Sequence, residues 1–352
     1  MSGTRQKSVI LVLGMHRSGT SALTRVLNLL GAGLCGDLLP QGQDNAMGFW
    51  ESASVLEANQ KILECLGSVW FDFSPLPPDA ADRPSVDKAL RNLAKVLERE
   101  LPTGQPAVLK DPRFCRLLPL VLPLFAEQGR MVKVVIIHRH PWEVALSLKK
   151  RNGFDQDLSL LLWMRHLLDA EQYSRALPRA MCGFEELLRD WPGVAKRLGH
   201  DLGIDWPVEP GEAKEAVEEF LTPGMRHHDA GNRRTNLTTT PLGQATDKLH
   251  TILQQSGADL ATVPTEAFDE ARGMLDRAAA FCAPLILRQL GNLHSVFEWA
   301  ESEKRELSAE NQRLAEALSA NKYQLEHITS SRIWRATRPL RLAAGRLKGR
   351  RR

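Results

Sequence analysis

A glycine-bounded loop of the kind that binds phosphate lies near the start of the chain. It reads GMHRSGTS from Gly14 to Ser21, after the apolar run VILVL and before a helical pattern. Gly14 and Gly19 have the spacing of a P-loop, which brings backbone N–H groups and a helix N-terminus close to an anion. Where a P-loop has lysine after the second glycine, this chain has Thr20, and the cation Arg17 lies inside the loop. The loop therefore predicts a phosphorylated donor other than a nucleoside triphosphate.

Apolar runs alternate with helical patterns along the chain, which indicates an α/β fold. The predicted strands are 7–13, 107–110 and 132–138, and the predicted helices lie near 19–31, 52–66, 85–100 and 114–127, with another starting at Pro141. Strands separated by helices favour a parallel sheet whose ligand lies at the carboxyl ends of the strands. The loop, Lys110 and the pair His138-Arg139 all follow such ends, so we expect them to converge.

A second anion site is predicted from an arginine and a serine around the third strand. Arg139 follows the strand, and Ser147 lies eight positions later, about two turns along the next helix. The forked donors of an arginine and a nearby hydroxyl suit a phosphate dianion. Both residues belong to an R-x-P-x-x-V-A-x-S pattern.

The loop and this pattern together resemble the sulfotransferases that use 3′-phosphoadenosine 5′-phosphosulfate (PAPS). In that family a loop like GMHRSGTS holds the 5′-phosphosulfate, and an arginine with a serine eight positions later holds the 3′-phosphate. The segment CGFEELLRDWP at 182–192 also looks like the family's later strand and helix. The resemblance covers residues 7–205 well and is loose from there to about 290.

The resemblance implies a P-loop-NTPase-like three-layer core with a central parallel sheet, PAPS as donor and sulfuryl transfer to a hydroxyl. It assigns the 3′-phosphate to Arg139 and Ser147. Its donor loop comprises Gly14, Arg17, Ser18, Gly19, Thr20 and Ser21. We expect Arg17, helped by Lys110, to stabilise charge on the transferred group and on the leaving phosphate oxygen.

Three candidates for the general base stay open. The family's cytosolic members have a histidine two residues after a strand-end lysine, where this chain has Pro112. Carbohydrate- and tyrosine-modifying relatives instead use a glutamate from the region after the first helix, which favours Glu51, ahead of Asp111 and His16. Each has a structural alternative: Glu51 stabilises the start of helix 52–66, Asp111 orients a neighbouring cation, and His16 shapes the donor loop.

Composition narrows the class of protein. The 352 residues are 43% hydrophobic and 25% charged, with a net charge of +4, and no apolar run approaches the length needed to span a bilayer. Five cysteines without a CxxC pair indicate reduced thiols in a cytoplasmic protein and argue against structural zinc, and we expect no metal. Nine basic residues and no acidic ones lie between 332 and 352, so the rest of the chain has a net charge of −5 (+4 minus 9). A mildly acidic body does not favour nucleic-acid binding.

Residues 222–243 are predicted to form a long surface loop, in the position of a basic lid over the donor. Arg226, Arg233 and Arg234 are its candidate donor contacts. The adjacent His227 and His228 lack the spaced partners of a closed metal site.

The chain changes character near its end. We expect a catalytic domain over 1–290, an amphipathic or coiled-coil helix over 295–328 and a basic tail over 329–352. Heptad spacing of Leu307, Leu314, Leu318, Leu325 and Ile328 leaves two alternatives open: a homodimer through 300–328, or one helix lying on the catalytic body.

The basic tail suits peripheral contact with an anionic membrane, on the inner face of the plasma membrane, or with an acidic polymer; its alternative is a solubilising tail. Its W-R-x-T-R-P-L-R string resembles segments of bacterial enzymes of surface-polysaccharide assembly, which favours a glycan or glycolipid acceptor. The sequence thus predicts a PAPS-dependent sulfotransferase. The rival hypotheses are an ATP-dependent nucleotide or sugar kinase and a non-catalytic scaffold with a nucleotide-binding fold.

Overall fold

The computed structural model of the protein describes residues 8–40, 48–221, 240–255 and 264–339, with the side chains of all of these except 290–311. Contacts within the chain divide it into two units, Met1–Pro284 and Leu285–Arg352. The predicted division near 290 to 295 stays a prediction. Among the described residues, no helix is both long enough and apolar enough to cross a membrane.

Four parallel strands form the centre of the first unit. They are β1 (Ser8–Leu13), β2 (Ala107–Lys110), β3 (Met131–His138) and β4 (Arg179–Gly183), in the order β2-β1-β3-β4 across the sheet. Val12 of β1 pairs with Lys110 of β2 on one side and with Val135 of β3 on the other. The chain places β2 on one side of β1 and then crosses to place β3 and β4 on the other side. The carboxyl end of β1 is therefore the topological switch point, where α/β sheets bind ligands.

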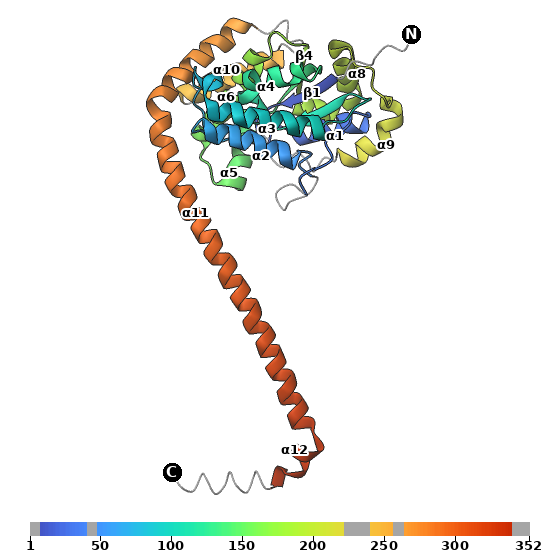
Figure 1. The fold of residues 1–352 in the computed structure, drawn as a ribbon, viewed down its shortest axis with the longest axis vertical. Coiled ribbons are helices and arrows are strands. Elements are labelled where there is room, and N and C mark those ends of the chain that lie inside the picture. Colours follow the sequence, from blue (N-terminus) through green and yellow to red (C-terminus); the bar gives the residue numbers. More distant parts are fainter. Residues whose placement is uncertain (1–7, 41–47, 222–239, 256–263, 340–352) are drawn as a thin grey trace. The chain divides into compact units, whose positions relative to one another are not determined.

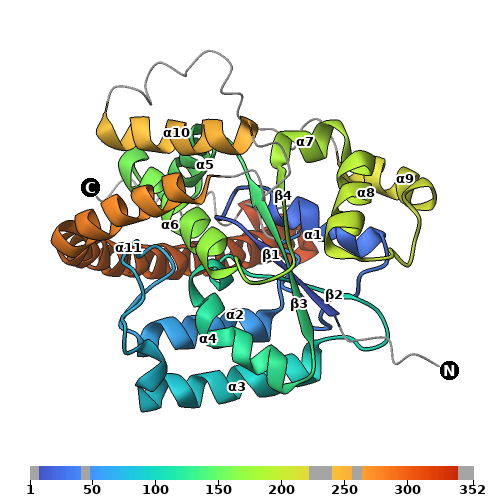
Figure 2. The ribbon, with the colours of Figure 1, turned by 90° about the horizontal axis from the view of Figure 1, so that it is seen from above.

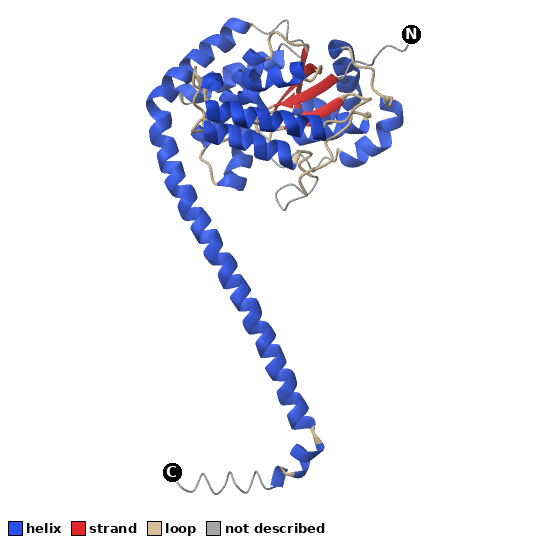
Figure 3. Ribbon diagram, in the orientation of Figure 1, coloured by secondary structure: helices blue, strands red, loops and turns tan. Residues whose placement is uncertain are grey.

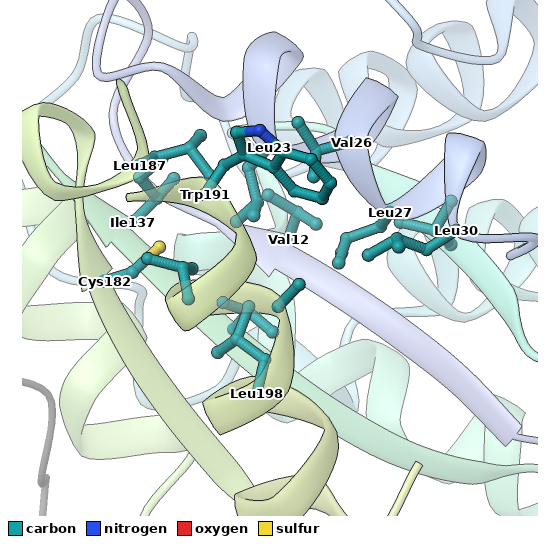
Figure 4. Packing of buried hydrophobic residues seen from close by; sticks show 14 of the residues in the cluster. Val12, Leu23, Val26, Leu27, Leu30, Ile137, Cys182, Leu187, Trp191 and Leu198 are labelled. Atoms are coloured by element: carbon teal, nitrogen blue, oxygen red, sulfur yellow. The ribbon is translucent and has the colours of Figure 1, made fainter. Parts of the chain in front are cut away.

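One face of the sheet is covered by α1 (Thr20–Leu29), α7 (Phe184–Arg189), α8 (Trp191–Leu202) and α9 (Pro210–Phe220), as Figure 2 shows. Leu23 and Leu27 of α1 pack with Trp191 of α8 against Val12 and Ile137 of the sheet (Figure 4). These side chains are almost completely buried. Because both faces of the sheet are covered, the strand sequences are continuous apolar runs without alternating polar residues. The packing fixes α1, and with it the loop that α1 follows.

The other face is covered by α4 (Phe114–Glu127) and α6 (Gln156–Tyr173), which contact β3. Beyond them lie α2 (Ala53–Cys65), η1 (Ala80–Asp82), α3 (Pro84–Glu100), α5 (Pro141–Asn152) and α10 (Pro241–Gln255). Helices therefore lie on both sides of the sheet (Figure 3), which confirms the predicted α/β fold with a central parallel sheet.

The predicted strands and early helices agree with the observed ones to within two residues at each end. The late strand and helix predicted within 182–192 are β4, which begins earlier at Arg179, and α7. All five cysteines are among the described residues and form no disulfide.

The C-terminal helix is longer than expected. One continuous helix, α11, runs over Thr265–Ser330 and is followed by α12 (Arg332–Ala336) (Figure 1). The helix therefore begins at Thr265, well before the predicted start at 295. In the first unit, Phe268 and Leu275 of α11 are buried. In the second, Leu314 and Leu318 are exposed. The homodimer through 300–328 stays a prediction.

Candidate active site

The phosphate-binding loop connects β1 to α1, and both of its glycines are required by close packing. A Cβ atom on Gly14 would lie 2.5 Å from the Ile137 carbonyl oxygen of β3. Gly19 has φ 93°, and its Cβ would lie 2.2 Å from Cδ2 of Phe184. No side chain other than hydrogen fits either position, so the loop follows the sheet closely.

The loop offers unsatisfied hydrogen-bond donors to an anion. Gly19, the N-cap of α1, makes no side-chain capping bond, and the first turn of α1 carries no acidic residue. The Ser18 N–H donates to the Met15 carbonyl at 3.1 Å, but the Ser18 hydroxyl is buried without a partner among the described residues. A buried orphan hydroxyl beside an uncapped helix N-terminus fits a phosphate or phosphosulfate group.

Arg17 joins the two predicted anion sites. Its backbone has φ 70°, in the left-handed region that residues other than glycine rarely adopt. Its Nε donates to the Ser147 hydroxyl of α5 at 2.7 Å, and its carbonyl accepts from Arg139 Nη1 at 3.5 Å. The loop and the Arg139–Ser147 pair therefore form one continuous site.

Arg139 is held from several directions, and sequence reasoning foresaw none of the three contacts that follow. Its Nε donates to Glu143 Oε2 at 2.7 Å, and its guanidinium lies 4.8 Å from the Phe184 ring centroid. Its backbone carbonyl accepts from Trp163 Nε1 at 3.1 Å. Glu143 could have been found as an acid four residues after the arginine, in the first turn of a helix. Phe184 gives no such signal, because Gly19 and Arg139 are distant from it in sequence and come close to it only in the folded protein.

Lys110 and Glu51 form a buried ion pair beside the loop. Lys110 ends β2, Glu51 immediately precedes Ser52, the N-cap of α2, and Lys110 Nζ contacts Glu51 Oε1. The same Nζ donates to the Ser21 hydroxyl at 3.1 Å, so Ser21 links the pair to the first turn of α1. Burial raises the pKa of the Glu51 carboxyl, and the Lys110 ammonium opposes that rise.

The carboxylate of Asp111 is committed to structural partners. Its Oδ1 accepts from the backbone N–H and from Nη1 of Arg113, both at 3.0 Å, and its Oδ2 accepts from Asn59 Nδ2 at 2.9 Å. These bonds orient Arg113 and attach α2 to the start of α4.

His16 lies at the edge of the donor loop, with its ring centroid 4.6 Å from Trp70 and 6.4 Å from His166. Burial, and then the guanidiniums of Arg151 and Arg113, lower the pKa of His16 well below 6.5. His166 was not foreseen. Its Nδ1 lies 2.9 Å from the Leu162 carbonyl, which can only accept, so Nδ1 carries the proton, and burial lowers the pKa of His166 to about 3.

The predicted lid contacts Arg226, Arg233 and Arg234 lie outside the described residues, as do His227 and His228. Within the part of the chain that the structure describes, no group of three or more His, Cys, Asp or Glu side chains is arranged to hold a metal ion.

No family model and no curated protein matches the chain. Among solved structures it is similar to the sulfotransferase domain from the curacin biosynthetic pathway, with TM-score 0.40 and 14% identity over 70% of this chain and 98% of that one. The sulfotransferase domain from the Synechococcus PCC 7002 olefin synthase gives 0.38 and 18%, over 78% and 96%. Mouse sulfotransferase SULT7A1, complexed with PAP, gives 0.37 and 15%, over 78% and 89%.

Proposed function

We propose that this chain is a PAPS-dependent sulfotransferase that moves the sulfuryl group to an acceptor hydroxyl by in-line transfer. The observation that carries the proposal is the contact between Arg17 and Ser147, because it joins a phosphate loop to a second anion site. A donor with phosphate groups at two ends of one nucleoside matches such a pair of sites. The kinase alternative gives no role to the second site.

In this proposal the donor is held by backbone and side-chain groups that follow β1 and β3. The loop N–H groups, the orphan Ser18 hydroxyl and the start of α1 bind the 5′-phosphosulfate. Arg139 and Ser147 bind the 3′-phosphate, and Glu143 positions Arg139 through its carboxylate. The chemistry then depends on position and charge, with little covalent work for the protein.

Glu51 is the proposed general base. It takes the acceptor hydroxyl proton as the acceptor oxygen forms a bond to sulfur and the bond from sulfur to the 5′-phosphate oxygen breaks. Arg17 and Lys110 stabilise the negative charge that develops on the leaving phosphate oxygen. A buried carboxyl with a raised pKa suits this role, because a base is most effective when its pKa lies near the working pH.

Donor binding tests the proposal directly. Calorimetry is expected to show clear preference for adenosine 3′,5′-bisphosphate over adenosine 5′-phosphate. Equal affinity for the two would overturn it, and magnesium-dependent ATP hydrolysis would favour the kinase. Arg17→Ala is expected to abolish sulfate transfer, whereas Glu51→Gln is expected to keep donor binding and lower turnover by about 10²- to 10⁴-fold. Near-normal turnover of Glu51→Gln would move the base role to Asp111 or His16.

The remaining parts of the proposal concern the surroundings of the reaction. The acceptor is a hydroxyl of a surface glycan or glycolipid precursor, reached from the cytoplasm. The exposed heptad residues Leu314, Leu318, Leu325 and Ile328 support pairing of two copies through 300–328. The basic tail, of which 340–352 lie outside the described residues, provides peripheral contact with an anionic membrane.

A further inference from the structure

Three half-buried aromatic rings form a cluster beside the donor loop that neither the fold nor the donor site explains. Trp70 and Phe154 stack with their ring centroids 5.7 Å apart, and Phe71 makes edge-to-face contacts with both, at 5.5 Å and 5.7 Å. All three retain solvent-accessible surface. Because the ring of His16 lies 4.6 Å from that of Trp70, the cluster begins next to Arg17. A molecule in contact with the cluster is therefore adjacent to the proposed transfer site.

The segment that carries Trp70 and Phe71 is fixed by two arginines that are almost completely buried. Arg116 donates through Nη1 to the Val69 carbonyl at 3.1 Å and through Nη2 to the Ser74 carbonyl at 3.0 Å. Arg165 donates through Nε to the Phe73 carbonyl at 2.8 Å. Burying guanidinium groups is costly, and here they bind the backbone of one connecting segment. The backbone that carries the two rings is thus held in place before any ligand arrives.

A cation borders the same cluster. The guanidinium of Arg151, in the last turn of α5, lies 5.4 Å from the Trp70 ring centroid. Arg151 is also close enough to His16 for its charge to lower the pKa of that histidine. Asp155 follows, but its carboxylate caps α6 by accepting from the Leu158 N–H at 2.8 Å. The rim of the cluster therefore favours a negatively charged ligand.

We propose that Trp70, Phe71 and Phe154, together with Arg151 at the end of α5, form the acceptor subsite and bind an acidic sugar residue of a glycan. The apolar face of a sugar ring suits partly exposed aromatic rings, and its carboxylate suits the neighbouring guanidinium group of Arg151. The assignment rests on the proposed sulfotransferase function. It narrows the acceptor from any surface glycan to one that carries uronic acids.

Binding of short oligosaccharides tests this subsite without a turnover assay. The probes are tetrasaccharides of galacturonate, mannuronate and guluronate, each with its methyl ester as a neutral partner of the same ring structure. Titrations are followed by saturation-transfer NMR on the protein saturated with adenosine 3′,5′-bisphosphate. At least one acid is expected to bind about tenfold more tightly than its ester, a difference that added salt reduces. No preference for any acid would overturn the inference.

Variants separate the roles of the ring and the charge. Trp70→Ala is expected to weaken binding of acid and ester alike by about tenfold, as truncation of an aromatic side chain that a ligand covers does. Arg151→Gln is expected to reduce the preference for the acid several-fold and to leave the ester unaffected. The matched controls Trp334→Ala and Lys322→Gln, on partly or fully exposed side chains of the second unit, are expected to bind as the unmodified protein does.

Three results distinguish failure of this inference from failure of the proposed function. Circular dichroism establishes whether each variant folds. If Trp70→Ala does not fold, the acid preference of Arg151→Gln tests the subsite. Unchanged acid preference in Arg151→Gln would overturn the subsite. A protein that prefers adenosine 3′,5′-bisphosphate but ignores every acidic probe refutes only the subsite. A protein without that nucleotide preference refutes the proposed function on which the subsite rests.

Discussion

The buried pair of Lys110 and Glu51 allows a double-mutant cycle whose outcome follows from burial. The two side chains are 2% and 7% exposed, so Glu51→Gln leaves an ammonium group with little access to water. Breaking a buried pair from one side costs about 3–5 kcal/mol. The Ser21 hydroxyl, 3.1 Å from Lys110 Nζ, still accepts one hydrogen bond, which places the expected cost at the lower end, about 3 kcal/mol.

Lys110→Met removes the other partner and isolates the carboxyl. Burial already raises the pKa of Glu51, so the carboxyl can take a proton, which limits the cost of losing Lys110. A folded state that holds a proton more tightly than the unfolded chain is stabilised as pH falls through the raised pKa, so the stability of this variant should recover in acid. The double variant Glu51→Gln/Lys110→Met carries no stranded charge. We expect it to cost about 2–4 kcal/mol less than the sum of the singles.

Urea unfolding of the four proteins near neutral pH measures this coupling. The control is the same cycle on Lys61 and Glu64, whose side chains are 65% and 48% exposed and whose coupling we expect to stay below about 1 kcal/mol. If the two buried substitutions add within about 0.5 kcal/mol, the pair is not energetically coupled and our account of Glu51 is wrong. If they couple as expected, the turnover of Glu51→Gln must be compared with that of the unmodified protein under conditions where both proteins are folded.

Three further predictions follow from neighbouring groups. Gly19→Ala is expected to destabilise the protein by at least about 2 kcal/mol and to abolish donor binding, because the new Cβ would overlap Phe184 at 2.2 Å. Ser147→Ala is expected to lower affinity for adenosine 3′,5′-bisphosphate by about tenfold in calorimetry without changing that for adenosine 5′-phosphate. His166 stays neutral in the fold, with its pKa lowered to about 3 from 6.5, so His166 should contribute about 2 kcal/mol to the loss of stability between pH 7 and pH 5, and His166→Gln should remove that contribution.

The glycine and histidine predictions each have a control on the same unit. Gly153 also has a positive φ, 72°, but nothing lies within 4 Å of its Cβ position, so Gly153→Ala should cost about 1 kcal/mol and spare donor binding. His200→Gln, on a side chain that is 89% exposed, should leave the acid dependence of stability unchanged. Equal loss from both glycine variants, or equal acid dependence in both histidine variants, would contradict the packing and burial arguments.

The sheet and most helices were predictable because their signals are local. Strand β1 is a run of apolar residues buried on both faces, and Pro141 marks the first turn of α5. The loop residues and Arg139 were predictable for a related reason, since each directly follows a strand. The start of α11 at Thr265 was not, because its first turns contain a mixed sequence whose helical face becomes apparent only against the body of the first unit.

The supporting side chains of the site were largely beyond sequence reasoning. Phe184 is separated by more than a hundred residues from Gly19, and nothing in either segment specifies that they meet. The partners of Asp111, among them Asn59 on α2, likewise depend on how helices pack. Spacing along a chain predicts which groups share an element. Which groups face one another across elements is decided by packing of the whole core.

The left-handed backbone of Arg17 sets a limit on how this protein can be stabilised. At φ 70° any side chain other than hydrogen costs about 1 kcal/mol, so glycine is the substitution that would relieve the strain. The same substitution would remove the cation that joins the two anion sites. A screen that selects only for heat resistance would therefore favour inactive molecules at this position, and improved variants should be sought by selecting for nucleotide binding as well.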